Sequence, residues 1–280
     1  MLKVALTHDV DRVRKSYQYI TKSIRYLKQH NFKKTYKELL SIPQRNRVYW
    51  NFPEIMEIED SLNVRSTFFF LNETIPINIF HPLKWKLSLG RYYVNETKIK
   101  QIIKTLDKNG WEIGLHGSFN SYYKSILLKE EKMLLESIVG HNILGIRQHY
   151  LNLCDKTWNI QKEVGFKYDS SFGFADAIGY KDDKIIPFRP FNDSFVVFPL
   201  SIMDSCYMED KNREQHLIQL IEKTQSHNGV LVLNWHSNNY DEGDFHGYKT
   251  TYISVIKEFK TIGAEFKTLK EYWEEYNQEL

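Results

Sequence analysis

Two aspartates with one residue between them stand close to the start of the chain. Asp9 and Asp11 follow a short hydrophobic run, where a buried strand would open into a loop. Two carboxylates at such a place can bind a metal ion, or divide the work between a metal ligand and a general base. On its own the pattern is weak, because aspartate often only caps a following helix.

Four later segments end in the same way, with an apolar run followed by a side chain that could bind a ligand or transfer a proton. They are Glu112–His116, Leu144–His149, Phe166–Asp169 and Val230–His236. When strands alternate with helices, the strand ends gather on one face of the sheet or barrel, where active sites of this architecture lie. Five such segments in order therefore indicate an enzyme.

His116 is the first candidate metal ligand beyond the aspartates. Ser118 and Asn120 follow it within one turn and add a hydroxyl and an amide oxygen. Aspartate and histidine together suit a borderline divalent ion, zinc above all, with one coordination position left for water. A structural role would be the default for His116 alone, but the company of Asp9 and Asp11 favours a ligand.

His236 is the candidate proton donor. It follows the most hydrophobic run of the chain, so a buried core histidine is the alternative. Imidazole can donate a proton to a leaving group near neutral pH. Arg147, at another strand end, could hold a carboxylate ionised and oriented. His149 is as readily a further ligand as a substrate contact, and His8 is ambiguous in the same way.

Composition bounds the class of protein. The chain is 42% hydrophobic and 15% aromatic; most aromatic residues must lie in a core, but Tyr150, Trp235 and Tyr240 stand near strand ends and could stack on a sugar ring. A net charge of only +3 gives no global field that would indicate nucleic acid. Cys154 and Cys206 form neither a metal-type spacing nor a disulfide framework.

No apolar run of the sequence reaches membrane-spanning length. Met1 leads within a few residues into the first strand, with no signal peptide between them. We therefore expect the cytoplasm, with a peripheral position at the inner membrane face as a further option.

The segment after the first strand is strongly basic. From Arg12 to Lys37 there are nine Lys or Arg residues and no Asp or Glu, which leaves 29 basic and 35 acidic residues in the rest of the chain. We expect a helical insertion over residues 12–43, as a solvated basic helix packed over the barrel mouth. The alternative is contact with a phosphorylated substrate or an anionic membrane surface through residues 12–37.

Strand-like runs alternate with helical patterns along the chain. Strands are expected at Lys3–Thr7, Ser66–Phe70, Glu112–His116, Leu144–His149, Phe166–Ser170, Phe195–Leu200, Val230–Trp235 and Glu265–Leu269. Helices with recognisable ends are expected at about 95–110, 155–165, 212–227 and 248–262. This alternation indicates βα units and a mostly parallel sheet or barrel. With no repeat or linker, residues 1–280 are predicted to form one α/β domain.

The order of these motifs resembles the polysaccharide deacetylase superfamily, also called the NodB-homology or carbohydrate esterase 4 superfamily. The resemblance spans nearly the whole chain, and its motifs are Thr7–Asp11, Ser66–Phe70, Glu112–His116, Gly145–Tyr150, Leu231–His236 and Phe266–Leu269. Each motif alone is weak, but their order and spacing together are fairly specific. The resemblance implies a distorted (β/α) barrel of the NodB-homology type.

The resemblance also implies an activity. It is the metal-dependent removal of an acetyl group from an amino sugar or acetylated sugar in surface-glycan biosynthesis, with an acetylated carbohydrate or lipid-linked glycan intermediate as substrate. Asp9 would be the general base and His236 the general acid. Arg147 would orient Asp9, and the backbone N–H of Tyr150 would help to hold the oxyanion.

The implied metal site is a divalent ion, zinc by preference, on Asp11, His116 and Asn120. Here the sequence departs from the family, because Val10 separates aspartates that are usually adjacent, and the roles of Asp9 and Asp11 could be exchanged. Asn120 stands where the family has its second metal histidine, so water or His149 could complete the site instead. Two other functions therefore stay open: hydrolysis of another C–N bond, such as a cyclic amide, and glycan binding without catalysis.

Overall fold

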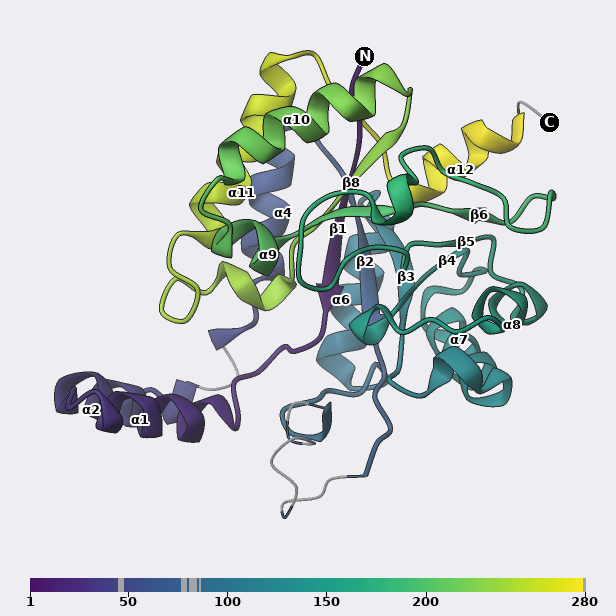
Figure 1. Cartoon of the computed structure of the whole chain (residues 1–280). Helices are drawn as coiled ribbons and strands as arrows, with labels where there is room; N and C mark the ends of the chain where they lie inside the picture. Colours follow the sequence, from purple (N-terminus) through teal and green to yellow (C-terminus); the bar gives the residue numbers. More distant parts are fainter. Residues whose placement is uncertain (45–47, 77–79, 81–84, 86, 279–280) are drawn as a thin grey trace.

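A parallel β-sheet forms the centre of the molecule in the computed structural model (Figure 1). The structure describes all residues except 45–47, 77–79, 81–84, 86 and 279–280. The strands are β1 (Lys3–Val10), β2 (Ser66–Leu71), β3 (Glu112–Gly117), β4 (Gly145–Gln148), β5 (Tyr168–Asp169), β6 (Val196–Val197), β7 (Leu200–Met203), β8 (Val230–Asn234) and β9 (Glu265–Phe266).

The sheet curls into a distorted (β/α) barrel, as expected. Its strands lie in the order β6-β5-β4-β3-β2-β1-β8-β7, with β9 also paired to β1. Among the described residues, the eight strand pairings are all parallel. The bridge between Gly173 and Leu200 brings the chain after β5 against β7 on the far side. The carboxyl ends of the strands therefore point to one end of the barrel.

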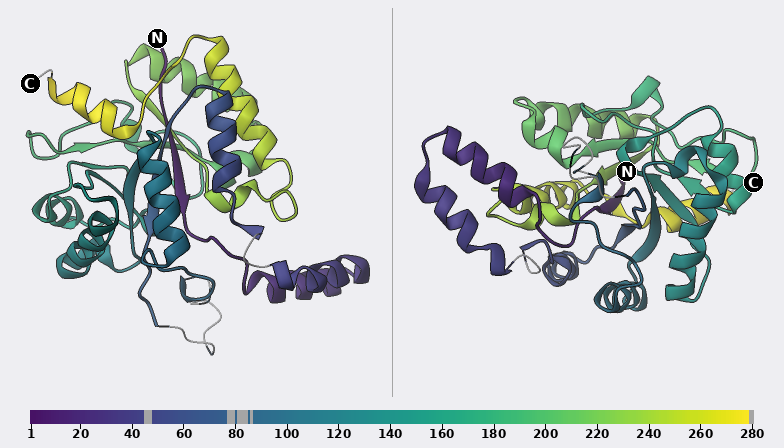
Figure 2. Two further views of the ribbon diagram at one scale, coloured as in Figure 1. Left: turned by 180° about the vertical axis from the view of Figure 1, so that it is seen from behind. Right: turned by 90° about the horizontal axis from the view of Figure 1, so that it is seen from below.

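Helices surround the sheet (Figures 1 and 2). They are α1 (Gln18–Lys28), α2 (Phe32–Leu40), α4 (Phe52–Ser61), α6 (Thr97–Lys108), α7 (Ser125–Val139), α8 (Thr157–Val164), α9 (Asp204–Glu209), α10 (Arg213–Ser226), α11 (Tyr248–Thr261) and α12 (Leu269–Gln278), and short 3-10 turns occur at Ile42–Gln44, Ser121–Tyr123, His149–Leu151, Lys181–Asp183 and Ser237–Tyr240. The four expected helices correspond to α6, α8, α10 and α11. Gly165 ends α8 in the left-handed conformation, with φ of 96°.

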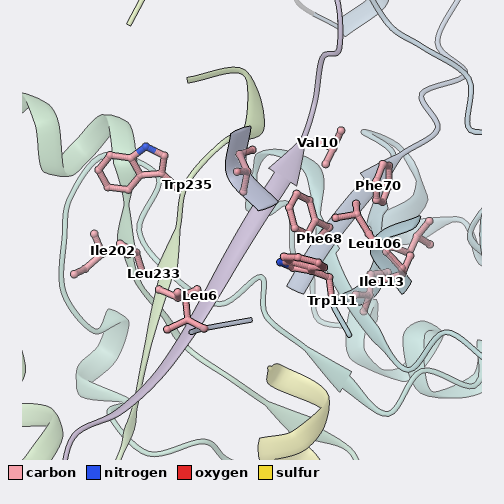
Figure 3. Close-up of a cluster of buried hydrophobic side chains, with 14 of the residues drawn as sticks. Leu6, Val10, Phe68, Phe70, Leu106, Trp111, Ile113, Ile202, Leu233 and Trp235 are labelled. Carbon is pink, nitrogen blue, oxygen red and sulfur yellow. The ribbon is translucent and has the colours of Figure 1, made fainter. Parts of the chain in front are cut away.

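Alternation along β1 separates two environments. Even-numbered residues such as Leu6 and Val10 face the surrounding helices and pack with Phe68 and Phe70 of β2 (Figure 3). Odd-numbered residues face the barrel interior, where Ala5 joins a second apolar cluster. Because side chains alternate with a period of two, Asp9 also faces the interior.

The predicted end of the first strand at Thr7 was too early. β1 runs to Val10, so Asp9 lies within the strand and Asp11 just beyond it. The strand expected at Phe195–Leu200 is instead two short strands, β6 and β7, and β7 ends immediately before Asp204. The later end of β7 places Asp204 at the carboxyl end of a strand.

The basic segment forms a hairpin of two helices, α1 and α2. His30 adopts a positive φ of 54° in the turn, and the Asn31 side chain caps α2 by accepting a hydrogen bond from the Lys34 N–H. Figures 1 and 2 both show the hairpin projecting from the barrel at the carboxyl ends of the strands, rather than lying over the barrel mouth as expected. No described helix is both long and apolar enough to cross a bilayer.

Candidate active site

The strand ends assemble a cavity of about 240 Å³ at the carboxyl end of the barrel. It is lined by Asp9, Asp11, His116, Gln148, His149, Tyr150, Leu151, Ala175, Met203, Ser205 and His236. A hollow of about 520 Å³ lies at the other end, beside Trp111 and Glu112, and its lining includes none of the residues just named. The smaller cavity is therefore the candidate site.

Asp9 is buried and fixed through both carboxylate oxygens. Oδ1 accepts a hydrogen bond from Nη1 of Arg147 at 3.0 Å, and Oδ2 accepts one from Nδ2 of Asn234 at 2.9 Å. Burial on its own would raise the pKa of Asp9, but Arg147 and the imidazoles of His116 and His236 outweigh it and lower this pKa. Asp9 is thus a fixed carboxylate at neutral pH.

Asp11 lies among three imidazoles. Its Oδ1 is 3.3 Å from Nε2 of His116 and 3.7 Å from Nε2 of His149, and its Oδ2 is 3.8 Å from Nε2 of His236. Burial would raise the pKa of Asp11, but His149, His116 and His236 hold it well below its usual range. Oδ1 is buried and has no hydrogen-bond partner among the described residues.

His116 presents a defined ring nitrogen to the cavity. Its Nδ1 lies 2.9 Å from the carbonyl oxygen of Arg147, and a carbonyl oxygen only accepts, so Nδ1 carries the proton. The lone pair of Nε2 is then left facing Asp11. Metal-binding histidines commonly have this arrangement.

His149 completes the group from the turn after β4. Its Nδ1 lies 3.8 Å from Oε2 of Glu73, which accepts a hydrogen bond from the Phe119 N–H at 3.0 Å. Burial would lower the pKa of His149, but Asp11 and Glu73 raise it to about 9. Tyr150 and Leu151 follow with positive φ of 59° and 53°, which turns the chain sharply at the cavity wall.

His236 approaches from the other side, after β8. Its Nδ1 lies 2.9 Å from Oδ1 of the buried Asp204, and its backbone N–H donates to Oδ2 at 2.8 Å. A carboxylate only accepts, so Nδ1 carries a proton and Nε2 points toward the cavity. Burial would lower the pKa of His236, but Asp204, Asp11 and Asp9 raise it to about 10.

A sequence comparison identifies the family. The family model described as "WbmS-like: Polysaccharide deacetylase" matches residues 92–239, just over half of the chain. The chain belongs to the polysaccharide deacetylase family. No curated protein sequence matches it.

Solved structures agree with the barrel. A "putative polysaccharide deacetylase" from Mycobacterium smegmatis has a TM-score of 0.62 at 17% identity, covering 100% of this chain and 91% of the other. A "probable Polysaccharide deacetylase" from Pseudomonas aeruginosa PAO1 has a TM-score of 0.61 at 12% identity, covering 99% and 91%. Puue allantoinase has the same TM-score and identity, covering 99% and 90%. At these identities the likeness shows the fold alone.

Polysaccharide deacetylases are generally metal-dependent, and the residues present fit a metal ion. Asp11, His116 and His149 each offer one ligand atom, and these atoms all lie within 4.8 Å of one another. One carboxylate and two imidazoles are ligands that zinc accepts in open catalytic sites. The unpartnered Oδ1 of Asp11 is also the kind of buried atom that a cation would satisfy.

Several predicted residues lie elsewhere. Asn120 follows β3 on a half-buried turn outside the cavity lining, so its role as a ligand stays a prediction. Trp235 and Tyr240 are buried in the apolar core and cannot stack on a sugar ring, whereas Tyr150 is half-exposed at the cavity. His8 is fully buried on the helix-facing side of β1 and bonds to Glu59, which is a core role.

Sequence reasoning missed two carboxylates beside the site. Asp204 orients His236, and Glu73 lies beside His149. Each follows an apolar strand, the same signal that found the other candidates. Asp204 was missed because the predicted strand ended at Leu200, and Glu73 because the second strand was expected to end in a run of phenylalanines.

Proposed function

We propose that this cavity hydrolyses the acetyl group of an amino sugar or acetylated sugar of a surface glycan. The observation that carries the proposal is the grouping of Asp11, His116 and His149, with Asp9 and His236 beside it. Family membership supports a hydrolase of amide or ester bonds. We further propose that residues 1–280 form one catalytic domain.

Asp11, His116 and His149 are assigned as the ligands of a divalent ion, by preference zinc. His149 replaces Asn120 in this assignment, because His149 lines the cavity and lies 3.7 Å from Asp11. When bound, the ion would polarise the acetyl carbonyl and lower the pKa of water. Asp11 is preferred to Asp9 as ligand because an oxygen of Asp11 is free of hydrogen bonds within the described structure.

Asp9 is assigned as the general base. Its ionised carboxylate accepts the proton of the attacking water, while Arg147 and Asn234 hold it in one orientation. His236 is assigned as the general acid, because its raised pKa keeps it protonated at neutral pH and ready to donate to the departing sugar nitrogen or oxygen. Two titratable groups with pKa values shifted in opposite directions are typical of such a division of work.

Tyr150 is assigned two contacts with the substrate. Its backbone N–H would help to hold the oxyanion, and its half-exposed ring would stack on the sugar. The substrate class we propose is an acetylated carbohydrate, including a lipid-linked glycan intermediate assembled at the inner membrane face. This corresponds to a protein of the cytoplasm.

The test is acetate release from an acetylated amino-sugar oligomer by the zinc-reconstituted protein. His236→Ala should lower turnover roughly a hundredfold or more, because a required proton donor is lost. His227→Ala is the matched control, since this histidine is exposed at the end of α10, and it should leave turnover unchanged. Undiminished acetate release by His236→Ala would refute the assigned role. Opening of a cyclic amide with no acetate release would support the rival hydrolase instead.

A further inference from the structure

The α1–α2 hairpin exposes its apolar residues instead of burying them. Seven of them leave 46% to 67% of their surface accessible: Ile20, Ile24, Leu27, Phe32, Tyr36, Leu39 and Leu40. Between the helices the structure buries mainly small or polar groups, namely Ser23 and Thr35 with Tyr19. A soluble protein rarely leaves so large an apolar group uncovered without a partner.

The exposed apolar residues of both helices lie on one side of the hairpin. In α1, Ile24 follows the buried Ser23 by one residue, and in α2, Tyr36 follows the buried Thr35 by one residue. One residue is a turn of about 100° in the same rotational sense. Since the two helices run antiparallel and face each other through the buried residues, this rotation carries both apolar stripes to the same face.

Basic residues border this apolar face. The next residue along each helix turns a further 100° or so away from the seam. At four places an exposed apolar residue is followed by an exposed basic one, in the pairs Ile24–Arg25, Leu27–Lys28, Phe32–Lys33 and Tyr36–Lys37. The outer edges of both helices are therefore positive. No acidic residue lies between Arg12 and Lys37.

Ion pairs fix the hairpin to the loop that follows His236. The buried Lys15 forms ion pairs with Asp244 at 2.8 Å and with Glu38 at 2.5 Å, and Lys22 forms one with the same oxygen of Asp244 at 2.6 Å. The hydroxyl of Tyr49 donates to the other oxygen of Asp244 at 2.6 Å. The hairpin thus leaves β1 just after Asp11 and is tied to the loop after His236.

From this arrangement we propose that the hairpin is a docking device for an anionic lipid bilayer. Its apolar face enters the interface, and its lysine and arginine borders contact the acidic headgroups. An apolar stripe with flanking basic side chains is the pattern of a helix that lies in the plane of a membrane surface. Docking would bring the mouth of the barrel close to that surface. This proposal goes beyond the proposed chemistry and does not depend on it.

Charge decides between this occupant and a second copy of the chain. Pairing two hairpins through their apolar faces would bring the basic borders of one copy near those of the other. An anionic bilayer would instead neutralise them, with roughly a fivefold gain in binding for each basic side chain. The bilayer is therefore the occupant to which the charge is complementary.

The experiment is sedimentation of the full-length protein with vesicles. Phosphatidylcholine vesicles containing phosphatidylglycerol should carry the protein down, and vesicles of phosphatidylcholine alone should not. Raising sodium chloride from about 0.1 M to about 1 M should release it, because the screening length falls from about 10 Å to about 3 Å.

Two sets of variants separate the charged from the apolar contribution. Arg25→Gln with Lys33→Gln and Lys37→Gln should lower the partition coefficient roughly a hundredfold. Ile24→Ser with Tyr36→Ser should lower it at least roughly tenfold. All five residues are exposed, so the unfolding midpoint should not change.

Matched controls come from helices on the barrel itself. Ile126→Ser with Met133→Ser removes exposed apolar residues of α7, and Lys100→Gln with Lys104→Gln removes exposed charges of α6. Both pairs should bind vesicles as the wild type does. The proposal is overturned if the wild type ignores anionic vesicles, or if the hairpin variants bind no worse than these controls. Dimers that dissociate on Ile24→Ser with Tyr36→Ser, without vesicle binding, would show a protein interface instead.

Discussion

At the residue scale, the candidate site depends on which ring nitrogen each histidine turns to the cavity. His116 donates through Nδ1 to the Arg147 carbonyl, and His236 donates through Nδ1 to Asp204. Both bonds leave Nε2 facing Asp11. The same imidazole chemistry can therefore provide a metal ligand on one side of Asp11 and a proton donor on the other.

Asp204→Asn tests the orientation of His236. The amide lacks the charge that raises the pKa of His236, so turnover should fall roughly a hundredfold while KM and zinc content stay near the wild-type values. Steady-state kinetics and metal analysis measure these quantities. Asp210→Asn is the control, because Asp210 pairs with His216 at 2.6 Å in the same way but outside the cavity lining. Equal losses in both variants would contradict the assignment.

Glu131 gives a prediction on pH and stability. It is buried, and burial raises its pKa to about 7, although hydrogen bonds from Ser118 oppose the shift. The unfolded chain ionises this group near its ordinary pKa of 4.5. The contribution of the protonated Glu131 to the free energy of unfolding is therefore complete below pH 4.5 and is lost as the pH rises toward 7. The loss should be about 3 kcal/mol.

Glu131→Gln should remove this loss. Urea unfolding at pH 4.5 and 7.5 should show the wild type losing about 3 kcal/mol more than the variant between the two values. An equal pH dependence for both proteins would show that Glu131 does not remain protonated in the folded state.

The chemical candidates could be found from sequence because each lies at or just beyond the carboxyl end of a buried strand. Asp9, Asp11, His116 and His236 all line one cavity, as the strand-end argument expected. Asp204 and Glu73 escaped because their strands end later than local patterns suggested. Their roles also depend on residues that are distant in the sequence. Asp204, for example, can orient His236 only because the fold brings the two side chains together.

At the element scale, β1 holds the two aspartates in place because it is paired on both sides, with β2 and β8. Its alternation sends Asp9 into the barrel and His8 toward α4. There Glu59 of α4 bonds to His8 at 2.7 Å and is fully buried. This polar contact fixes the helix on the strand that holds the aspartates.

Glu59→Ala should be strongly destabilising. Glu59 also accepts hydrogen bonds from Ser66, Trp111 and Tyr252, so its removal leaves several buried donors without a partner. The free energy of unfolding should fall by about 3–5 kcal/mol. Glu57→Ala, on the exposed face of α4, should change it by no more than about 0.5 kcal/mol. A Glu59 effect as small as that of Glu57 would contradict the buried network.

The barrel helices that could be predicted combine apolar residues at helical spacing with a glycine shortly after the last turn. α8 and α11 end near Gly165 and Gly263, and their apolar residues keep helical spacing. α7 was not predicted, although Gly140 ends it in the left-handed conformation, because its buried face includes the charged Glu131 and Lys132 beside leucine and isoleucine. α9 has only six residues and follows β7 directly, with no loop between the strand and the helix.

At the scale of the whole molecule, residues at the carboxyl ends of strands from β1 to β8 come together at one end of the barrel. The alternation of strands and helices predicted this architecture, and the fold is confirmed. The direction of the α1–α2 hairpin could not be predicted, because the same apolar spacing would serve a helix packed on the barrel. The structure shows that the hairpin projects from the barrel (Figure 2) and that those apolar residues are exposed.

The central claim is that Asp11, His116 and His149 hold a divalent ion between an acid and a base. Elemental analysis of protein purified without chelator and dialysed against zinc tests it most directly. We expect one zinc ion per chain in the wild type and in Asn120→Ala, and a large loss of zinc in His149→Ala. Protein without metal after zinc supplementation, or a loss in Asn120→Ala that His149→Ala does not share, would contradict it.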